Sequence, residues 1–158
     1  MHSTIIALDN IRSHHNVGAI FRSADAFGIT EVILGGITPR PPHRDIHKSA
    51  LGATESVPWT HSESLLERLG GLKDQGFKLI AIEQTSNSVP IHSVTPLREK
   101  LCLILGNEVN GVHPDILGIC HQVVDIPQVG IKKSLNVSVC AGIVMFYFQS
   151  GLDLPKNV

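Results

Sequence analysis

Short runs of apolar residues, rich in β-branched side chains, recur along the chain and are separated by polar or helical stretches. Runs that are apolar at every position are typical of strands buried on both faces, as in a parallel sheet. Their alternation with helical patterns predicts an α/β fold, with a mostly parallel sheet covered by helices on both faces. The expected strands are residues 4–8, 31–34, 57–60, 77–82, 101–105 and 123–126.

Helices are expected where apolar side chains recur at intervals of three and four residues. Residues 17–27 show this spacing, with Asn16 as the expected N-cap and Gly28 as the residue that ends the helix. Pro114 stands at the first position of a shorter helix, where its missing N–H is not needed. The other expectations are a helix over residues 62–73, a helical turn over 49–54, and loops over 35–47 and 83–95.

Residues 136–148 are apolar at almost every position and follow a polar segment, residues 132–136. A helix that is apolar all round is buried, whereas a surface helix shows one apolar stripe. We expect one face of this helix to be buried in its own domain and the other in a partner subunit, since it would otherwise expose a large patch. A polar loop held against such a helix is suited to holding a ligand.

Composition narrows the class of protein. A chain of 158 residues has the length of one domain, and a net charge of −1 gives no overall field for nucleic acid, so an RNA site must be a local patch. Three cysteines without a CxxC pair indicate reduced thiols in a cytoplasmic protein. The N-terminus lacks the features of a signal peptide, and no apolar run approaches the roughly 20 residues that cross a membrane.

A first polar segment reads NxRxxxNxGxxxRxxD over residues 10–25. Its helix starts where a strand ends, so the free N–H groups of the helix face the edge of the sheet at which open α/β folds bind ligands. Asn16 and Arg22 are the candidate functional side chains. An alternative is that Asn16 only caps the helix and Arg22 only pairs with Asp25.

Two further polar segments follow strands in the second half of the chain. Residues 106–111, GNEVNG, place two glycines, two amides and one carboxylate after a buried strand, and glycine lets backbone approach a ligand closely. An ordinary strand-to-helix turn would have the same composition. Residues 126–136 lead into the apolar helix, and Ser134 or Asn136 can serve simply as its N-cap.

Several common sites are absent from the sequence. It has no GxGxxG after a strand, no Walker A pattern and no HExxH, which argues against a Rossmann dinucleotide site, a P-loop and a zinc protease. No Cys/His cluster has the spacing of a zinc site, so no metal is expected.

Taken together and in this order, the three segments resemble the motifs of the SpoU/TrmH-type 2′-O-ribose RNA methyltransferases of the SPOUT superfamily. The resemblance rests on NxRxxxNVGAIFRSADAFGI (residues 10–29), LILGNEVNGV (103–112) and IPQVGIKKSLNVSVCAGIVMF (126–146). The intervening HKSALGATESVPW (47–59) is also similar to the family. The resemblance covers nearly the whole chain, and the order of the three motifs is specific.

The resemblance implies a parallel α/β sheet whose C-terminal segment forms a deep trefoil knot, with S-adenosylmethionine bound in the knot. It also implies a homodimer through the C-terminal helix, and methylation of a ribose 2′-hydroxyl in RNA, with tRNA favoured and rRNA as the alternative. Residues 1–158 would form one methyltransferase domain without an appended RNA-binding domain. Residues 150–158 carry a single cation, Lys156, so RNA affinity would come from the dimer surface.

Residue by residue, the resemblance assigns three groups of side chains. The catalytic and supporting group is Arg22, Asn16, Glu108, Ser134 and Asn136. The cofactor pocket would be formed by Glu83, Gln84, Leu105, Gly106, Gly111, Ile126, Pro127 and Leu135. The candidates for RNA binding are Arg12, Arg40, Arg44, Lys48, Lys132 and Lys133.

The expected reaction is attack of a ribose 2′-oxygen on the methyl group of a sulfonium. Arginine is effectively always charged, so we expect Arg22 to bind the neighbouring phosphate and align the hydroxyl rather than remove its proton. Two other hypotheses stay open: a non-catalytic knotted RNA-binding protein, and a generic nucleotide-binding α/β enzyme. The missing phosphate-loop motifs argue against the second of these.

Overall fold

Seven strands form one sheet in the order β3-β2-β1-β6-β4-β7-β5, and each neighbouring pair is parallel. The structure, a computed structural model, describes residues 2–96 and 99–150, so Lys156 lies outside the described residues. The predicted mostly parallel sheet is confirmed. The strands are β1 (Ser3–Asp9), β2 (Glu31–Gly35), β3 (Trp59–Ser62), β4 (Lys78–Ile82), β5 (Val89–Pro90), β6 (Lys100–Gly106) and β7 (Gln122–Asp125).

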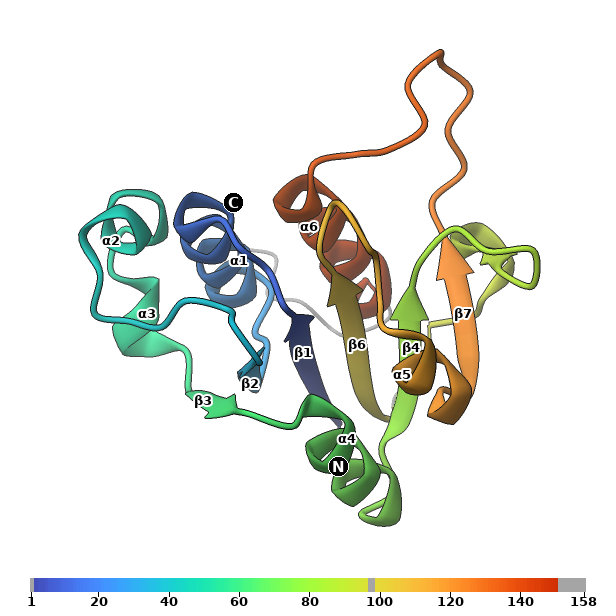
Figure 1. Cartoon of the computed structure of the whole chain (residues 1–158), viewed down its shortest axis with the longest axis horizontal. Helices are drawn as coiled ribbons and strands as arrows, with labels where there is room; N and C mark the ends of the chain where they lie inside the picture. Colours follow the sequence, from blue (N-terminus) through green and yellow to red (C-terminus); the bar gives the residue numbers. More distant parts are fainter. Residues whose placement is uncertain (1, 97–98, 151–158) are drawn as a thin grey trace.

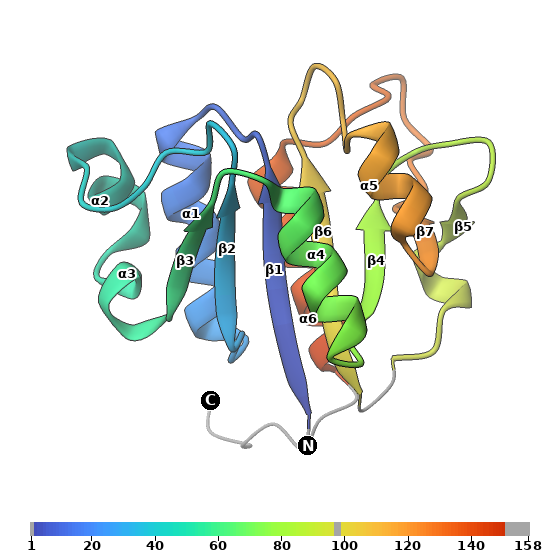
Figure 2. The ribbon, with the colours of Figure 1, turned by 60° about the horizontal axis from the view of Figure 1, so that its bottom comes forward.

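Helices cover both faces of the sheet, as the alternating pattern predicted (Figures 1 and 2). One face carries α1 (His14–Ala26), α2 (Arg44–Ala50), α3 (Ala53–Ser56) and α6 (Val137–Gln149), and the other carries α4 (Leu65–Asp74) and α5 (Pro114–Ile119). A short 3₁₀ turn, η1, spans Ile91–Ser93. Within the described residues, no helix is both long enough and apolar enough to cross a bilayer.

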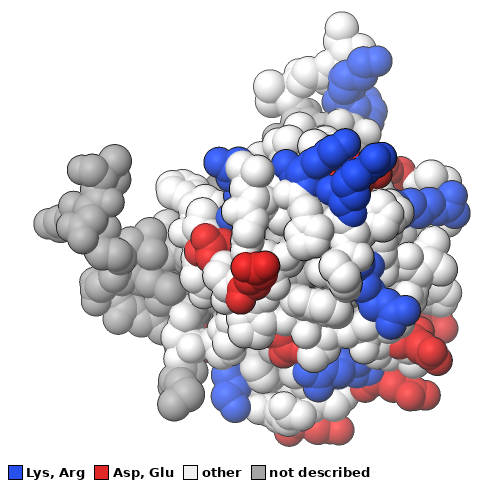
Figure 3. Space-filling model, turned by 90° about the vertical axis from the view of Figure 1, so that its left-hand side faces the viewer, with Lys and Arg blue, Asp and Glu red and all other residues white. Residues whose placement is uncertain are grey.

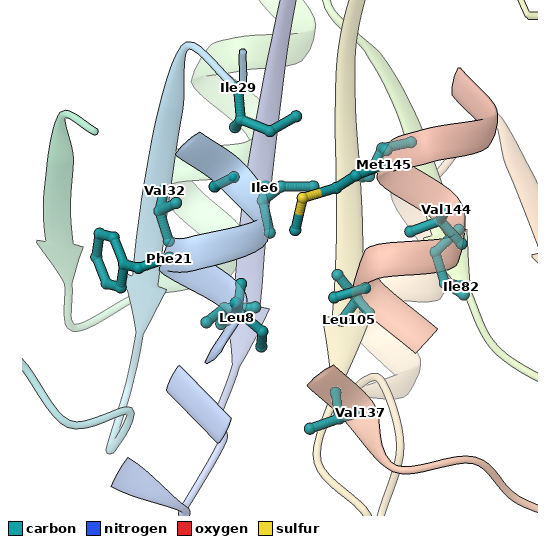
Figure 4. Packing of buried hydrophobic residues seen from close by; sticks show 14 of the residues in the cluster. Ile6, Leu8, Phe21, Ile29, Val32, Ile82, Leu105, Val137, Val144 and Met145 are labelled. Carbon is teal, nitrogen blue, oxygen red and sulfur yellow. The ribbon is translucent and has the colours of Figure 1, made fainter. Parts of the chain in front are cut away.

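Two hydrophobic clusters lie on opposite faces of the sheet because strand side chains alternate between faces. In β1, Ile6 and Leu8 join the cluster beneath α1 and α6, whereas Ile5 and Ala7 join the cluster beneath α4. Figure 4 shows Ile6 and Leu8 between the sheet and the helices α1 and α6, with Met145 of α6 close by. Each large aliphatic side chain buried in this way stabilises the fold by roughly 1.5–3 kcal/mol.

The structure corrects the start of the first helix. α1 begins one turn earlier than predicted, and its N-cap is Ser13, whose Oγ accepts a hydrogen bond from the Asn16 N–H at 3.1 Å. Asn16 therefore lies inside the first turn, and its side chain is free for another partner. The predicted end of α1 agrees, since Phe27 is its C-cap and Gly28 follows with a φ of 64°.

Two other helical predictions are partly wrong. The helix predicted over residues 62–73 starts at Leu65, with Ser64 as its N-cap. The helical turn predicted over residues 49–54 is instead the break between α2 and α3, where Leu51 and Gly52 both have a positive φ.

Two predicted loops contain regular structure. Residues 35–47 were expected to be irregular, but α2 starts at Arg44 with His43 as its N-cap. The helix is only two turns long and buries only Ile46 and Ala50, too few positions to show a helical period in the sequence. Residues 83–95 likewise contain β5 and η1, where a strand of two residues gives no alternating pattern.

The close approach of α1 to α2 depends on Gly18. A Cβ atom at this position would overlap the Ser49 hydroxyl and the Ile46 carbonyl oxygen of α2. Ser49 Oγ in turn donates a hydrogen bond to the His15 carbonyl at 2.8 Å. The glycine of the first motif is therefore a packing residue between two helices.

Gly18→Ala should lower the free energy of unfolding by about 1–3 kcal/mol, because a methyl group at this contact overpacks the interface. The matched control is Gly70→Ala in α4, where a Cβ atom meets nothing within 4 Å. That change should raise the stability by about 0.5–1 kcal/mol, since alanine loses less backbone freedom in a helix. Urea unfolding of both variants measures the difference; equal effects of the two changes would contradict the packing role.

Candidate functional site

The central strands end at the same level of the sheet. Asp9 at the end of β1 pairs with both Gly35 of β2 and Gly106 of β6. Ile82 at the end of β4 pairs with Leu105 and Val124. The loops that follow these strands therefore leave from one edge, which is where open parallel sheets bind ligands.

A cleft of about 310 Å³ opens at this edge, between the loops after β4, β6 and β7 and the first turns of α6. The connection from β7 to α6 forms one wall and then projects away from the body of the molecule (Figure 1). Pro127 is not among the lining residues. The other seven residues predicted to hold the cofactor do line the cleft: Glu83, Gln84, Leu105, Gly106, Gly111, Ile126 and Leu135.

The loop after β6 is folded tightly onto itself. A Cβ atom at Gly106 would overlap the backbone of Gly111 and Val112, and Gly111 has a φ of 65°, which favours glycine. The Glu83 carboxylate holds this turn from the neighbouring strand, since its Oε2 accepts the Val112 N–H at 2.9 Å and its Oε1 accepts the Gln84 N–H at 3.0 Å. The glycines of the second motif thus let two backbone segments meet beside the cleft.

A chain of hydrogen bonds connects the three sequence motifs. Asn16 Nδ2 donates to Glu108 Oε1 at 2.8 Å, and Asn136 Nδ2 donates to Asn16 Oδ1 at 3.2 Å. Asn136 also caps α6, because its Oδ1 accepts the Ser138 N–H at 2.9 Å. Asn16 is 6% exposed, so it is a buried connection between segments far apart in the sequence. The capping role suggested for Asn136 is confirmed, whereas the one suggested for Asn16 is wrong.

The five residues predicted for catalysis do not all meet in one chain. Glu108 and Ser134 line the cleft, and Asn16 and Asn136 support it through the hydrogen bonds above. Arg22 is exposed on α1 and is not a lining residue. It lies six positions after Asn16, about 9 Å farther along the helix axis. The chain alone therefore does not bring Arg22 to the cleft.

Sequence reasoning missed several residues of the cleft. Asp125 lines it from the end of β7 and accepts a hydrogen bond from Ser88 Oγ at 2.6 Å. Its place at a strand end was the signal that could have found it. Cys140 of α6 also lines the cleft, and burial raises the pKa of its thiol to about 11, with the negative charge of Glu83 acting in the same direction.

Two of the predicted RNA-binding cations lie at or beside the cleft, since Lys133 lines it and Arg12 lies next to it. Arg12 follows β1, and it lines a second, small hollow together with Glu108. Arg44 and Lys48 are on α2, where both approach Asp45, at 3.5 and 3.6 Å. Figure 3 views the molecule from the left-hand side of Figure 1. It shows Lys and Arg side chains gathered on the upper part of the molecule and on the projection above it. In the described residues, no group of three or more His, Cys, Asp or Glu side chains could hold a metal.

Residues 3–146 match the SpoU rRNA Methylase family. The chain belongs to this family.

Relatives of this SpoU-family chain are named as methyltransferases of different RNAs. It is 28% identical to the tRNA (guanosine(18)-2′-O)-methyltransferase of Escherichia coli K12, over 96% of this chain and 67% of that protein. It is 35% identical to the 23S rRNA (guanosine-2′-O-)-methyltransferase RlmB of Nitrosomonas europaea, over 96% of this chain and 60% of that protein. It therefore spans about two thirds or less of their length.

The fold is also that of solved members of the group. The AdoMet-bound rRNA methyltransferase from Sinorhizobium meliloti superposes with a TM-score of 0.90 at 26% identity, over 96% of this chain and 58% of that one. The prediction that residues 1–158 form one domain without an appended RNA-binding domain stays a prediction.

Asn16→Asp should destabilise the SpoU-family chain by about 1–3 kcal/mol at neutral pH, because a second carboxylate would face Glu108. Like charges raise the pKa of such a pair in the folded state, so the penalty is complete above the folded pKa and disappears as pH falls below the unfolded one. Urea unfolding at pH 8 and pH 4.5 measures this. Gln75→Glu, which adds the same charge at an exposed position, is the control; a penalty that does not shrink in acid would argue against the contact.

Proposed function

We propose that this chain transfers a methyl group from S-adenosylmethionine to a ribose 2′-hydroxyl of RNA, with tRNA favoured and rRNA as the alternative substrate. The hydrogen-bond chain from Asn136 through Asn16 to Glu108 carries the proposal, because it assembles three distant motifs around one cleft. A protein that only bound RNA would not need that assembly beside a small-molecule pocket. Methyltransferases of both tRNA and 23S rRNA among the relatives support the reaction class.

The cleft suits the proposed cofactor. Its volume of about 310 Å³ is within the usual range of small-molecule sites, roughly 300–1,000 Å³. Its walls combine exposed backbone around Gly106 with the apolar side chains of Leu105, Ile126 and Leu135. When bound, the cofactor supplies a methyl group attached to a positively charged sulfur. The residues of the chain would hold that group, orient the ribose and exclude water.

The hydrogen-bonded residues would position the substrate side of the site. Glu108 lines both the cleft and the small hollow that contains Arg12, so it stands between the two. Ser134 lines the cleft from the other wall. We place Arg22 on the RNA backbone, where its planar guanidinium can bind a phosphate in bidentate fashion and align the neighbouring hydroxyl.

A homodimer through α6 is part of the proposal. Val139, Ile143 and Phe146 follow one another at intervals of four and three residues, and they are 51%, 38% and 58% exposed. The opposite face of α6 is buried, and Gly142 faces Ser23 of α1. A second copy docked on this stripe would cover it and would bring the exposed face of α1, with Arg22, to the edge of the interface.

The finer features of the fold belong to the same proposal. We propose that the C-terminal segment is threaded as a trefoil knot; its support is the family resemblance and the return of α6 to pack against α1 and β6. An experimental structure, traced with its ends held fixed, tests the threading. RNA would lie over Arg12, Arg40, Arg44 and Lys48, and over the loop with Lys132 and Lys133. A cytoplasmic location would accompany such a substrate.

With labelled cofactor, the protein should methylate total RNA at 2′-hydroxyls, and ribose mapping should find one or a few positions. Arg22→Lys should lower the single-turnover rate by about 100-fold, since lysine cannot bind phosphate through two parallel bonds. The control Arg68→Ala removes a cation that pairs with Glu31 on the far side of the sheet and should leave the rate unchanged. Binding of RNA without any methyl transfer would favour the non-catalytic alternative.

Ile143→Glu should convert the dimer to a monomer at micromolar concentration, because it places a charge in the centre of an apolar interface. Leu66→Glu is the matched control, since Leu66 is 37% exposed on α4 and Ile143 is 38% exposed on α6. Sedimentation velocity of the two variants and the unchanged chain measures the effect. A monomeric unchanged chain would rule out the dimer.

A further inference from the structure

The cleft has an unbalanced charge. Among the residues that the structure describes, three carboxylates line it, those of Glu83, Glu108 and Asp125, together with one ammonium group, that of Lys133. Their formal sum is −2, whereas the whole chain has a net charge of −1. Negative charge is therefore concentrated at this site rather than spread over the molecule, and a partly enclosed site strengthens the interaction of such charges with a bound ion.

Each of the three carboxylates is fixed by a donor from the protein. Glu83 accepts two backbone N–H groups, at 2.9 and 3.0 Å. Asp125 accepts Ser88 Oγ at 2.6 Å, and Glu108 accepts Asn16 Nδ2 at 2.8 Å. Charges held in this way act at defined positions and need no rearrangement when a ligand arrives.

Glu83 has the most central position of the three. It follows β4, and its N–H donates to the Val124 carbonyl of β7 at 3.0 Å, so its neighbour across the sheet is Asp125. Its Oε2 lies against Gly111 of the β6 loop. Its charge also acts on the thiol of Cys140, which belongs to the α6 wall. Glu83 therefore lies close to the end of β7, to the glycine loop after β6 and to the α6 wall.

The proposed donor and its product differ in charge at one atom. S-adenosylmethionine carries a positive sulfonium, whereas S-adenosylhomocysteine, left after methyl transfer, has a neutral thioether. The two molecules share their adenosine, ammonium and carboxylate groups. We infer that the fixed carboxylates of the cleft, Glu83 foremost, discriminate the charged methyl donor from its neutral product. This inference rests on the proposed function. It has one consequence, which is that the affinity of the site for the ligand falls when the methyl group is transferred.

The test compares the affinities of the chain for the two ligands, measured by calorimetry without RNA. Glu83→Gln removes the charge and keeps one oxygen that can accept the Val112 N–H, but the Gln84 N–H loses its acceptor. Asp125→Asn, which keeps an acceptor for Ser88 Oγ, is therefore measured beside it. We expect Glu83→Gln to lower the preference for S-adenosylmethionine over S-adenosylhomocysteine by about five- to ten-fold. Lys133→Gln should raise the same preference, because Lys133 is the only cation among the described residues that line the cleft. Groups common to both ligands cancel in this ratio.

The controls separate charge from structure. Glu63→Gln removes a carboxylate at an exposed position outside the cleft and should leave the ratio unchanged. Sinefungin, which carries an ammonium near the position of the methyl sulfonium, should respond to Glu83→Gln as the methyl donor does. If Glu83→Gln fails to fold, Asp125→Asn, which keeps an acceptor for Ser88, provides the same comparison.

The outcomes distinguish the two levels of the proposal. If neither ligand binds the unchanged chain, the proposed function fails. If both bind and Glu83→Gln weakens them equally, or leaves both unchanged, the charge discrimination is wrong while the proposed function stands. A selective loss of the charged ligands, with the opposite change in Lys133→Gln, supports it.

Discussion

The register of the parallel strands is the constraint on which the site depends. Because β1, β4 and β6 end at one level, the loops that follow them leave from a single edge. Residues as distant in sequence as Asn16 and Asn136 can then form a direct hydrogen bond. Slipping one strand by one position would exchange the side chains that it places in the two hydrophobic clusters, so the same packing that stabilises the sheet also fixes the site.

Sequence patterns predicted the elements that depend mainly on residues close together in the chain. Strands β1, β2, β4 and β6 were predictable because each contains a continuous apolar run, and the end of α1 because Gly28 takes a conformation that suits glycine. The start of α1 was not predictable, because Ser13 and Asn16 are both good caps. The choice between them depends on Glu108, 92 residues away, which gives the Asn16 side chain a better partner. The helix α2 was missed because it buries too few side chains to show a period.

The apolar helix α6 shows a different limit. Its sequence is apolar on every face, and from that alone the whole helix is expected to be buried. In the chain, one face packs on the sheet and α1, whereas Val139, Ile143 and Phe146 remain exposed. An apolar sequence indicates that each face of the helix must be covered. It does not indicate whether the same chain or a second copy covers it. The threading that we propose for the C-terminal segment could not be predicted from a local pattern for a related reason, since it would be a property of the whole path of the chain.

Each carboxylate of the cleft has two properties, its capacity to accept hydrogen bonds and its negative charge, and the fold depends mainly on the first. The glycine turn needs an acceptor for the Val112 N–H, Ser88 needs one for its hydroxyl, and Asn16 needs one for its amide. An uncharged amide oxygen could accept a hydrogen bond from the Ser88 hydroxyl or the Asn16 amide, but it could not replace both oxygens of Glu83, which accept two backbone N–H groups. The chain instead uses Glu83, Asp125 and Glu108, and concentrating three like charges in one cleft works against the stability of the fold. The loops explain the acceptors, and in our proposal the charges that accompany them recognise a ligand with a positive charge of its own.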